Sequence, residues 1–200
     1  MRVIAAALVS SAVVVHEAHA MNSQQLPIRL IGPGGAGKST VGALIADRLE
    51  IPFTDLDACF ADRVGDITEY INRFGYDAYA QNNVEIYRSL ANESTGRCVT
   101  ALSSGFMTYP QNVHPEYEGL RCDVERSPMT FVLIPSLDRE LCVTETVRRQ
   151  LARPFARSSA QEEAVIRERF PIYVGLAARK TETLRPLAAV VDELLMSIDC

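Results

Sequence analysis

The stretch Gly32-Pro33-Gly34-Gly35-Ala36-Gly37-Lys38-Ser39-Thr40 decides the fold of this chain. It matches the pattern G-x-x-x-x-G-K-[ST], a loop whose backbone N–H groups surround the phosphates of a nucleotide. Lys38 is expected to reach the β- and γ-phosphates, and the Ser39 hydroxyl is expected to bind Mg²⁺. A plain glycine-rich turn is the alternative, but the pattern arises by chance in fewer than about one chain in a hundred of this length. The predicted cofactors are ATP and Mg²⁺, and the predicted nucleotide-binding residues are Gly32, Gly34, Gly35, Ala36, Gly37, Lys38, Ser39 and Thr40.

The flanking residues place this loop between a strand and a helix. The mostly apolar run 27–31 has the length of a strand. Beyond the loop, apolar residues recur at helical spacing, at Val41, Leu44, Ile45 and Leu49. A helix in this place points its N-terminus at the phosphates, which favours the binding of an anion.

Length and composition favour one compact domain. The chain has 200 residues, of which 48% are hydrophobic, enough for a real core. Its net charge of −5 argues against a broad nucleic-acid-binding face, whereas the arginines at 148, 149, 153 and 157 suggest a local anion site. The cysteines lack the spacing of metal ligands, which predicts reduced thiols without metal at Cys59, Cys98, Cys122, Cys142 and Cys200.

The N-terminal residues 1–20 have two interpretations. Arg2, the apolar run 3–15 and Ala18-His19-Ala20 resemble a secretory signal with its cleavage site, although the run is short for a membrane span. Met21 follows directly, so residues 1–20 are alternatively an extension upstream of the true start. Because the phosphate loop needs ATP, we expect a cytoplasmic protein with a single domain over residues 21–200 and no stable membrane association; export would follow if residues 1–20 act as a signal.

Two acidic residues follow the next strand. The run Pro52–Asp55 reads as a short second strand that ends in Asp55-Leu56-Asp57. In an open α/β sheet, ligands bind at the carboxyl ends of the strands, so both carboxylates are expected to face the nucleotide. The alternative is a solvated turn.

A helical pair is expected between the second and third strands, in an insert over about 56–92 that could hold a phosphate acceptor. Asp66 caps its first helix, Glu69 completes a start like a capping box, and Gly75 ends it. The second helix is predicted over about 77–90. The aromatic residues of the pair are interpreted as packing rather than as ligand contacts: Tyr70, Phe74, Tyr76 and Tyr79.

The second half supplies two further strands, a lid and a last helix. The runs 98–102 and 130–134 are predicted strands, separated by a loop and part of a helix over 106–128, in which His114 is interpreted as a surface residue. A helix over 137–149 is followed by small, polar and basic residues, typical of a mobile lid over about 150–165. A helix then continues through Arg169, with a restart expected at Pro171, and a last helix begins at Pro186.

Three motifs make the chain resemble the shikimate kinase family over about 27–195. These are Phe53-x-Asp55-x-Asp57, Arg153-Pro154-Phe155 and Arg169-Phe170-Pro171-Ile172-Tyr173, similar in order and spacing to that family's F-x-D-x-D, R-P-L and R-x-P-L-Y signatures. The resemblance implies an α/β, three-layer P-loop kinase fold of the nucleoside-monophosphate-kinase type. In that fold a five-stranded parallel sheet carries helices on both faces. It also implies transfer of the γ-phosphate of ATP to a ring hydroxyl of shikimate.

The resemblance implies a role for each matched residue. Asp55 would support Mg²⁺ through water, and Asp57 would hold and orient the acceptor hydroxyl. Arg153 would swing in from the lid to neutralise charge on the transferring phosphoryl group, making Lys38, Asp57 and Arg153 the expected catalytic residues. Arg169 would hold the substrate carboxylate in a bidentate contact. Either Arg148 or Arg149 would lie against adenine.

Two departures from the family concern the acceptor. Ser103-Ser104-Gly105 stands where the family has three glycines, whose backbone amides approach the substrate, so only Gly105 is retained. Residues 75–81 lack the arginine that gives the family a second carboxylate contact, and such a loss costs roughly 1.5–3 kcal/mol. We therefore expect a small hydroxylated acid as partner of a monomeric enzyme. Shikimate is the first choice, and another sugar acid, a cyclitol or a non-catalytic ATP-binding regulator are the alternatives.

Overall fold

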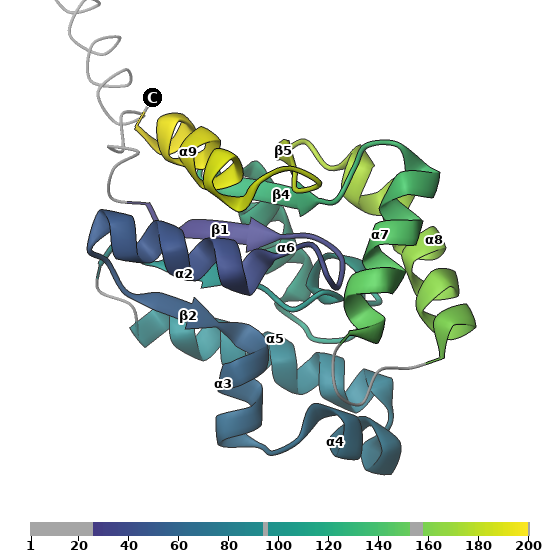
Figure 1. The fold of residues 1–200 in the computed structure, drawn as a ribbon. Coiled ribbons are helices and arrows are strands. Elements are labelled where there is room, and N and C mark those ends of the chain that lie inside the picture. The colour runs from purple at the N-terminus through teal and green to yellow at the C-terminus, as the bar shows by residue number, and fades with distance from the viewer. Residues whose placement is uncertain (1–25, 94–95, 153–157, 200) are drawn as a thin grey trace, which may run out of the picture.

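A computed structural model describes residues 26–93, 96–152 and 158–199 of this chain. Its centre is a five-stranded sheet in the order β2-β3-β1-β4-β5, with every neighbouring pair parallel (Figure 1). The strands are β1 (Ile28–Ile31), β2 (Phe53–Asp55), β3 (Val99–Ala101), β4 (Thr130–Ile134) and β5 (Arg179–Glu182). This architecture confirms the predicted fold class.

Helices cover both faces of the sheet. They are α2 (Lys38–Leu49), α3 (Leu56–Arg63), α4 (Ile67–Phe74), α5 (Tyr76–Glu93), the 3₁₀ helix η2 (Phe106–Thr108), α6 (Tyr117–Arg126), α7 (Arg139–Leu151), α8 (Ser159–Gly175) and α9 (Leu187–Ile198). Side chains alternate along the strands: Leu30 and Phe131 pack with α2 and α9, whereas Ile31 and Val132 belong to the core on the opposite face. Because both faces are covered, every residue of β4 is buried.

The junction after β2 differs from the prediction. We expected Asp57 to extend the end of a strand, but β2 stops at Asp55 and α3 begins at Leu56. Asp55 is the N-cap of α3: its Oδ1 accepts the backbone N–H groups of Asp57 (2.9 Å) and Ala58 (3.2 Å). Asp57 therefore lies in the first turn of a helix, which the sequence prediction did not include.

The helical pair of the insert follows the prediction closely. Asp66 caps α4 by accepting the backbone N–H of Glu69 at 2.8 Å, and the helix ends at Gly75, whose φ of +89° favours glycine. The second helix, α5, extends beyond the predicted range to Tyr76–Glu93.

The fifth strand could not be located from its residues alone. Arg179-Lys180-Thr181-Glu182 is almost entirely polar, so it carries no apolar pattern. It pairs with β4 at the edge of the sheet, where Thr181 is buried and Arg179 is exposed. The neighbouring strand, rather than local hydrophobicity, gives this segment its conformation.

Residues 106–128 contain η2 and the whole of α6 rather than a loop with part of a helix. His114 is not simply a surface residue: its Nε2 lies 3.3 Å from a carboxylate oxygen of Glu85, and its Nδ1 accepts the backbone N–H of Glu116. These contacts join α5 to the segment before α6.

The residues predicted to form a lid, about 150–165, are largely helical where the structure describes them. Ser158 caps α8 in a reciprocal capping box with Gln161, so residues 159–161 already belong to a helix. The same helix continues through Pro171 without the expected restart. Arg153 and the rest of 153–157 lie outside the described residues, as does the N-terminal segment 1–25.

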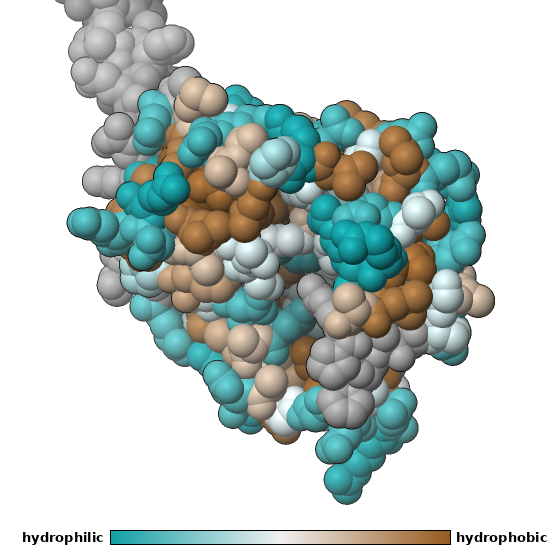
Figure 2. All heavy atoms as spheres, viewed as in Figure 1, coloured by the Kyte–Doolittle hydropathy of each residue, from teal (hydrophilic) through white to brown (hydrophobic). Residues whose placement is uncertain are grey.

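Figure 2 shows apolar side chains gathered on the face formed by α2 and α9. Leu44 of α2 and Leu187 of α9 are exposed, so only part of the apolar stripe predicted after the phosphate loop is buried. No helix in the described part of the chain is long and apolar enough to cross a membrane. The four cysteines that the structure describes, Cys59, Cys98, Cys122 and Cys142, are free thiols.

Candidate active site

The phosphate loop connects β1 to α2 and relies on glycine for its shape. Gly32, Gly35 and Gly37 have φ values of +144°, +73° and +92°, which side chains rarely allow. A Cβ atom on Gly32 would also lie 2.0 Å from the carbonyl oxygen of Leu133. The loop thus packs against β4 and ends at Gly37, the N-cap of α2. This arrangement is what the sequence predicted for an anion site at a helix N-terminus.

Lys38 folds back over the loop. Its Nζ donates to the carbonyl oxygens of Gly32 at 2.8 Å and Pro33 at 3.0 Å, and only 9% of the residue is exposed. These contacts hold the ammonium beside the backbone that would surround the phosphates. The side chain is therefore positioned for the role that the motif predicts.

Two oxygen-bearing side chains meet beside the start of α2. The Ser39 hydroxyl donates to Oδ2 of Asp55 at 2.5 Å, while Oδ1 of Asp55 is fixed by capping α3. Mg²⁺ prefers oxygen ligands and keeps several waters, so one hydroxyl and one nearby carboxylate suit it. No group of three or more His, Cys, Asp or Glu residues that could hold a metal ion occurs among the described residues. One hydroxyl beside one carboxylate thus fits a Mg²⁺ that keeps most of its water ligands.

Asp57 is half-buried at the start of α3, and donors from two other segments hold it. Its Oδ1 accepts the Ser103 hydroxyl at 2.5 Å and the Tyr79 hydroxyl at 3.2 Å. Burial, followed by the nearby charge of Asp57, raises the pKa of Tyr79 above its ordinary value of 10.0, so Tyr79 stays a donor.

Arg169 of α8 reaches the loop after β3. Its Nη1 donates to the carbonyl oxygen of Ser104 at 3.2 Å, and its Nη2 donates to the Tyr76 hydroxyl at 2.8 Å. The Tyr173 hydroxyl donates to the same Ser104 carbonyl at 2.9 Å. A Cβ atom on Gly105 would lie 2.2 Å from the Tyr76 hydroxyl oxygen and 3.3 Å from Nη2 of Arg169, so a side chain here would displace Tyr76. The structure thus places Arg169 beside Gly105.

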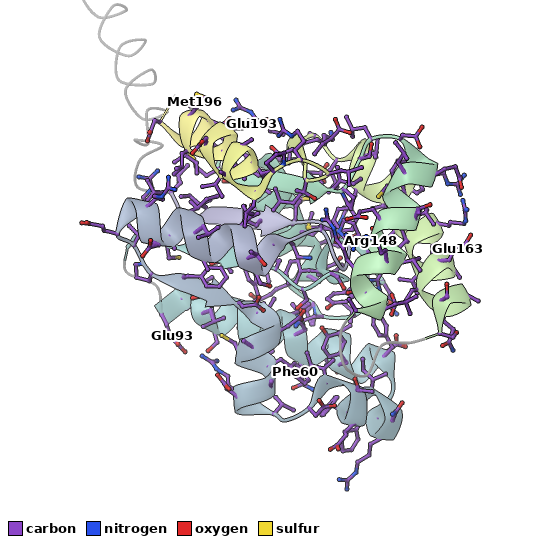
Figure 3. All side chains as sticks on the ribbon, in the orientation of Figure 1. Phe60, Glu93, Arg148, Glu163, Glu193 and Met196 are labelled. Carbon is purple, nitrogen blue, oxygen red and sulfur yellow. The ribbon has the colours of Figure 1, made fainter. Side chains whose placement is uncertain are left out.

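All four aromatic residues of the helical pair pack, as interpreted, but two of them also make polar contacts with predicted site residues. Tyr70 and Phe74 do pack: their ring centroids lie 4.7 Å apart, and Tyr70 also meets Phe60, which Figure 3 labels on α3. In addition to packing, Tyr76 contacts Arg169 and Tyr79 contacts Asp57. No local pattern of the sequence separates these two tyrosines from Tyr70 and Phe74.

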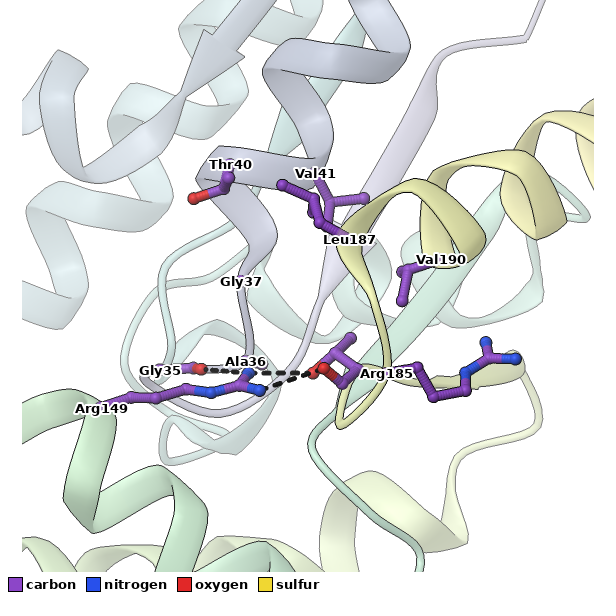
Figure 4. Close-up of a pocket in the computed structure, with 10 residues that line it drawn as sticks. Gly35, Ala36, Gly37, Thr40, Val41, Arg149, Arg185, Leu187 and Val190 are labelled. Atoms are coloured by element: carbon purple, nitrogen blue, oxygen red, sulfur yellow. Dashed lines mark hydrogen bonds between the residues drawn. The ribbon is translucent and has the colours of Figure 1, made fainter.

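A pocket of about 310 Å³ lies beside the phosphate loop, between the loop and the segment 183–190 (Figure 4). Its lining includes Gly35, Ala36, Gly37, Thr40, Val41, Arg149, Thr183, Arg185, Leu187 and Val190. The position next to the loop and the mixture of apolar and cationic side chains suit the base end of a nucleotide. The sequence had indicated the loop residues but not those from the segment 183–190.

The structure distinguishes the two arginines of α7. Arg149 Nη1 donates to the Gly35 carbonyl and to Thr183 Oγ1, each at 3.1 Å, and Figure 4 shows both bonds. Arg148, labelled in Figure 3, pairs with Glu145 and has a side chain that is 69% exposed. Arg149 is therefore the arginine that lines the pocket. Hydrogen bonds from Arg148 and then Arg149 lower the pKa of Glu145 to about 2.

The loop, the sheet and the nearby acidic and basic side chains define the class of the protein, a P-loop phosphotransferase. The family model for shikimate kinase matches residues 34–199. This chain therefore belongs to the shikimate kinase family, as its motifs predicted. It is a phosphotransferase of that family with the P-loop kinase fold.

Individual relatives agree with this assignment. The shikimate kinase of Geobacter metallireducens is 30% identical over 169 residues, which cover 82% of this chain and 87% of that protein. The solved shikimate kinase of Bacteroides thetaiotaomicron has a TM-score of 0.69 at 18% identity, covering 88% of this chain and 99% of that one. The shikimate kinase of Acinetobacter baumannii, solved in complex with shikimate, has a TM-score of 0.65 at 24% identity, covering 88% and 94%. At these identities the two structures support the fold.

Proposed function

We propose that this protein transfers the γ-phosphate of ATP to a hydroxyl of shikimate, giving shikimate 3-phosphate. One observation carries the proposal: Asp57 is bonded to Ser103, and Arg169 is bonded to the adjacent Ser104. A carboxylate for holding a hydroxyl and a guanidinium for holding a carboxylate thus lie along the same short loop. A small hydroxylated acid has both groups that this arrangement would recognise.

Catalysis would consist mostly of positioning and charge stabilisation. Ser39 and Asp55 would hold Mg²⁺, which when bound supplies positive charge next to the β- and γ-phosphate oxygens. Lys38 would bind the same phosphates, and Asp57 would orient the attacking hydroxyl and accept its proton. Arg149 would lie at the adenine end. Arg153 keeps its proposed role at the transferring phosphoryl group.

The domain and compartment assignments are part of the proposal. Residues 21–200 would form the single kinase domain, with a lid near 150–165, in a monomeric cytoplasmic enzyme. The core contacts of the described residues begin at Leu26, just before β1, so a chain that starts at Met21 should fold and retain activity. Comparing the solubility and activity of the two chains tests this, and unfolding of the shorter chain would contradict it.

The direct test of the reaction is a panel of acceptors. The protein is incubated with ATP, Mg²⁺ and shikimate, quinate, gluconate or inositol, while ADP is measured. The ratio of kcat/KM values decides the acceptor, because specificity reflects differential binding of the transition state. Shikimate is expected to be preferred. An advantage of roughly 10³-fold or more for another compound, about 4 kcal/mol, would overturn shikimate and keep the kinase.

A second candidate is a kinase for another sugar acid or a cyclitol. The favouring observation is that Arg169 pairs with the neutral Tyr76 hydroxyl, while residues 75–81 contain no arginine. The proposed acceptor site therefore offers an acidic group less positive charge than a site with two arginines would. A non-catalytic ATP-binding regulator is the remaining alternative, favoured by Ser103 and Ser104 in place of glycine. Tight ATP binding without ADP release across the whole panel would support it.

A further inference from the structure

We propose that Ser103 is a positioning residue that occupies one oxygen of Asp57, so that the other oxygen holds a single acceptor hydroxyl rather than two adjacent ones. The inference rests on the proposed function, because it assumes that Asp57 faces the acceptor. It gives a role to a serine that stands where the family has a glycine. The proposed role of Ser103 also limits the acceptors to compounds that bind Asp57 through one hydroxyl.

A chain of hydrogen bonds fixes the direction in which Ser103 donates. The Tyr109 hydroxyl donates to Oδ1 of Asn83 at 3.0 Å, and Nδ2 of Asn83 donates to Oγ of Ser103 at 2.8 Å. An amide NH₂ group can only donate, so the serine oxygen accepts from Asn83. The serine proton is then directed to Asp57, whose ionised carboxylate can only accept.

Burial keeps this series of hydrogen bonds in one arrangement. Asn83 is 0% exposed, Ser103 is 1% exposed and Tyr109 is 5% exposed, so water does not compete for their bonds. Burial, followed by the nearby Tyr79, raises the pKa of Tyr109 well above its ordinary value of 10.0. Tyr109 therefore remains a donor, and the order of donors and acceptors does not change in neutral solution.

The geometry at Asp57 leads to the selectivity. A carboxylate oxygen has room for about two hydrogen bonds, and Oδ1 already receives those from Ser103 and Tyr79. Across residues 26–93, 96–152 and 158–199, no protein group donates to Oδ2. A glycine at position 103 would remove one donor from Oδ1 and open that oxygen to a second acceptor hydroxyl. Two adjacent hydroxyls would bind a carboxylate one to each oxygen, so with Oδ1 filled Ser103 prevents this paired contact and leaves Asp57 one hydroxyl at Oδ2.

The experiment uses Ser103→Gly and Ser103→Ala with two acceptors. One is shikimate, and the other is the deoxy analogue of shikimate that lacks the hydroxyl next to the one phosphorylated. In the wild type the analogue should lose less than about 10-fold in kcat/KM. In Ser103→Gly the loss of this hydroxyl should reduce kcat/KM about 10-fold more than it does in the wild type. This corresponds to a coupling of roughly 1.4 kcal/mol between the serine and the neighbouring hydroxyl. Ser103→Ala should lower kcat about 10-fold or more and leave KM for ATP unchanged.

Controls separate positioning from a general loss of structure. Ser89→Ala removes a hydroxyl that bonds Glu93 near the far end of α5, and it should behave as the wild type. Thermal unfolding shows whether each variant folds. Restoration of kcat by Ser103→Thr, which keeps the donor, would support positioning. Equal acceptor selectivity in the wild type and in a folded Ser103→Gly variant would overturn the proposal.

A crystal structure of Ser103→Gly supplies a test that needs no turnover. The Asp57 carboxylate should leave its single orientation, because only Tyr79 would still hold Oδ1. An unchanged Asp57 would contradict the positioning role. If the wild type phosphorylates no hydroxylated compound, the proposed function fails, and the orientation of Asp57 in this variant still decides whether Ser103 holds it.

Discussion

The two ends of the proposed active site, one for the phosphates and one for the acceptor, are built in different ways. The phosphate end is one continuous loop, and it relies on backbone conformation at Gly32, Gly35 and Gly37. The acceptor end combines Asp57 from α3, Tyr79 from α5, the loop after β3 and Arg169 from α8. Backbone conformation is encoded locally, so the first end can be recognised from a motif. The second end depends on which distant side chains meet.

The largest effect is expected at the phosphate end. Replacing Lys38 by alanine removes the one ammonium that folds over the loop and should lower kcat by about 10³-fold, because a buried charge that stabilises the transition state is lost. ADP production at saturating acceptor measures this. Lys180→Ala, on β5, serves as the matched control and should retain activity. Nearly normal turnover by a folded Lys38→Ala variant would show that this loop does not act as a phosphate site.

The next effect concerns the charged group of the acceptor end. Arg169→Lys keeps the positive charge but loses the planar guanidinium, so KM for an acidic acceptor should rise roughly 10- to 100-fold while kcat changes little. Steady-state kinetics with both substrates separates the two parameters. A parallel rise of KM for ATP would contradict this assignment, because Arg169 contacts the loop after β3 rather than the phosphate loop.

A smaller effect is expected at Tyr76. Tyr76→Phe removes only the hydroxyl that accepts from Arg169 at 2.8 Å, and KM for an acidic acceptor should rise by less than about 10-fold, as for the loss of one hydrogen bond. Tyr70→Phe is the control, since the Tyr70 hydroxyl bonds Asn82 and its ring packs on Phe60. An equal change of KM in both variants would contradict a role of the Tyr76 hydroxyl in acceptor binding.

The smallest effect should appear in the pH dependence of stability. Glu145 has a folded pKa lowered from 4.5 to about 2, so its ion pairs stabilise the fold fully above about pH 4.5. The contribution is lost as the pH falls through about 2. Glu145→Gln should lower Tm slightly, by an amount equivalent to about 1 kcal/mol or less, and the difference from the wild type should shrink toward pH 2. Glu163→Gln, which breaks an exposed pair with Arg167, is the control. A difference that grows on acidification would contradict the lowered pKa.

Much of the fold follows from local sequence patterns. The apolar run 130–134 is β4, and the helix predicted from Asp66 to Gly75 begins and ends at those caps. Helix α3 was not predicted, because its first residues overlap the Asp55-Leu56-Asp57 motif, which was assigned to the end of a strand. Strand β5 was not located, because its polar residues become a strand only beside β4. Local rules therefore fail where a neighbouring element decides the conformation.

The sequence by itself determined the phosphate loop and the family, and it singled out Asp57 and Arg169 as candidate site residues. These depend on residue types at short, fixed spacings, in which glycine dihedrals and a helix N-terminus carry the chemistry. The tertiary structure alone decided that Arg149 rather than Arg148 lines the pocket, that Tyr76 contacts Arg169 and that Tyr79 contacts Asp57. It also decided that Ser103 donates to Asp57, 46 residues away in the sequence. Such contacts depend on the packing of separate helices against one sheet, which no local pattern specifies.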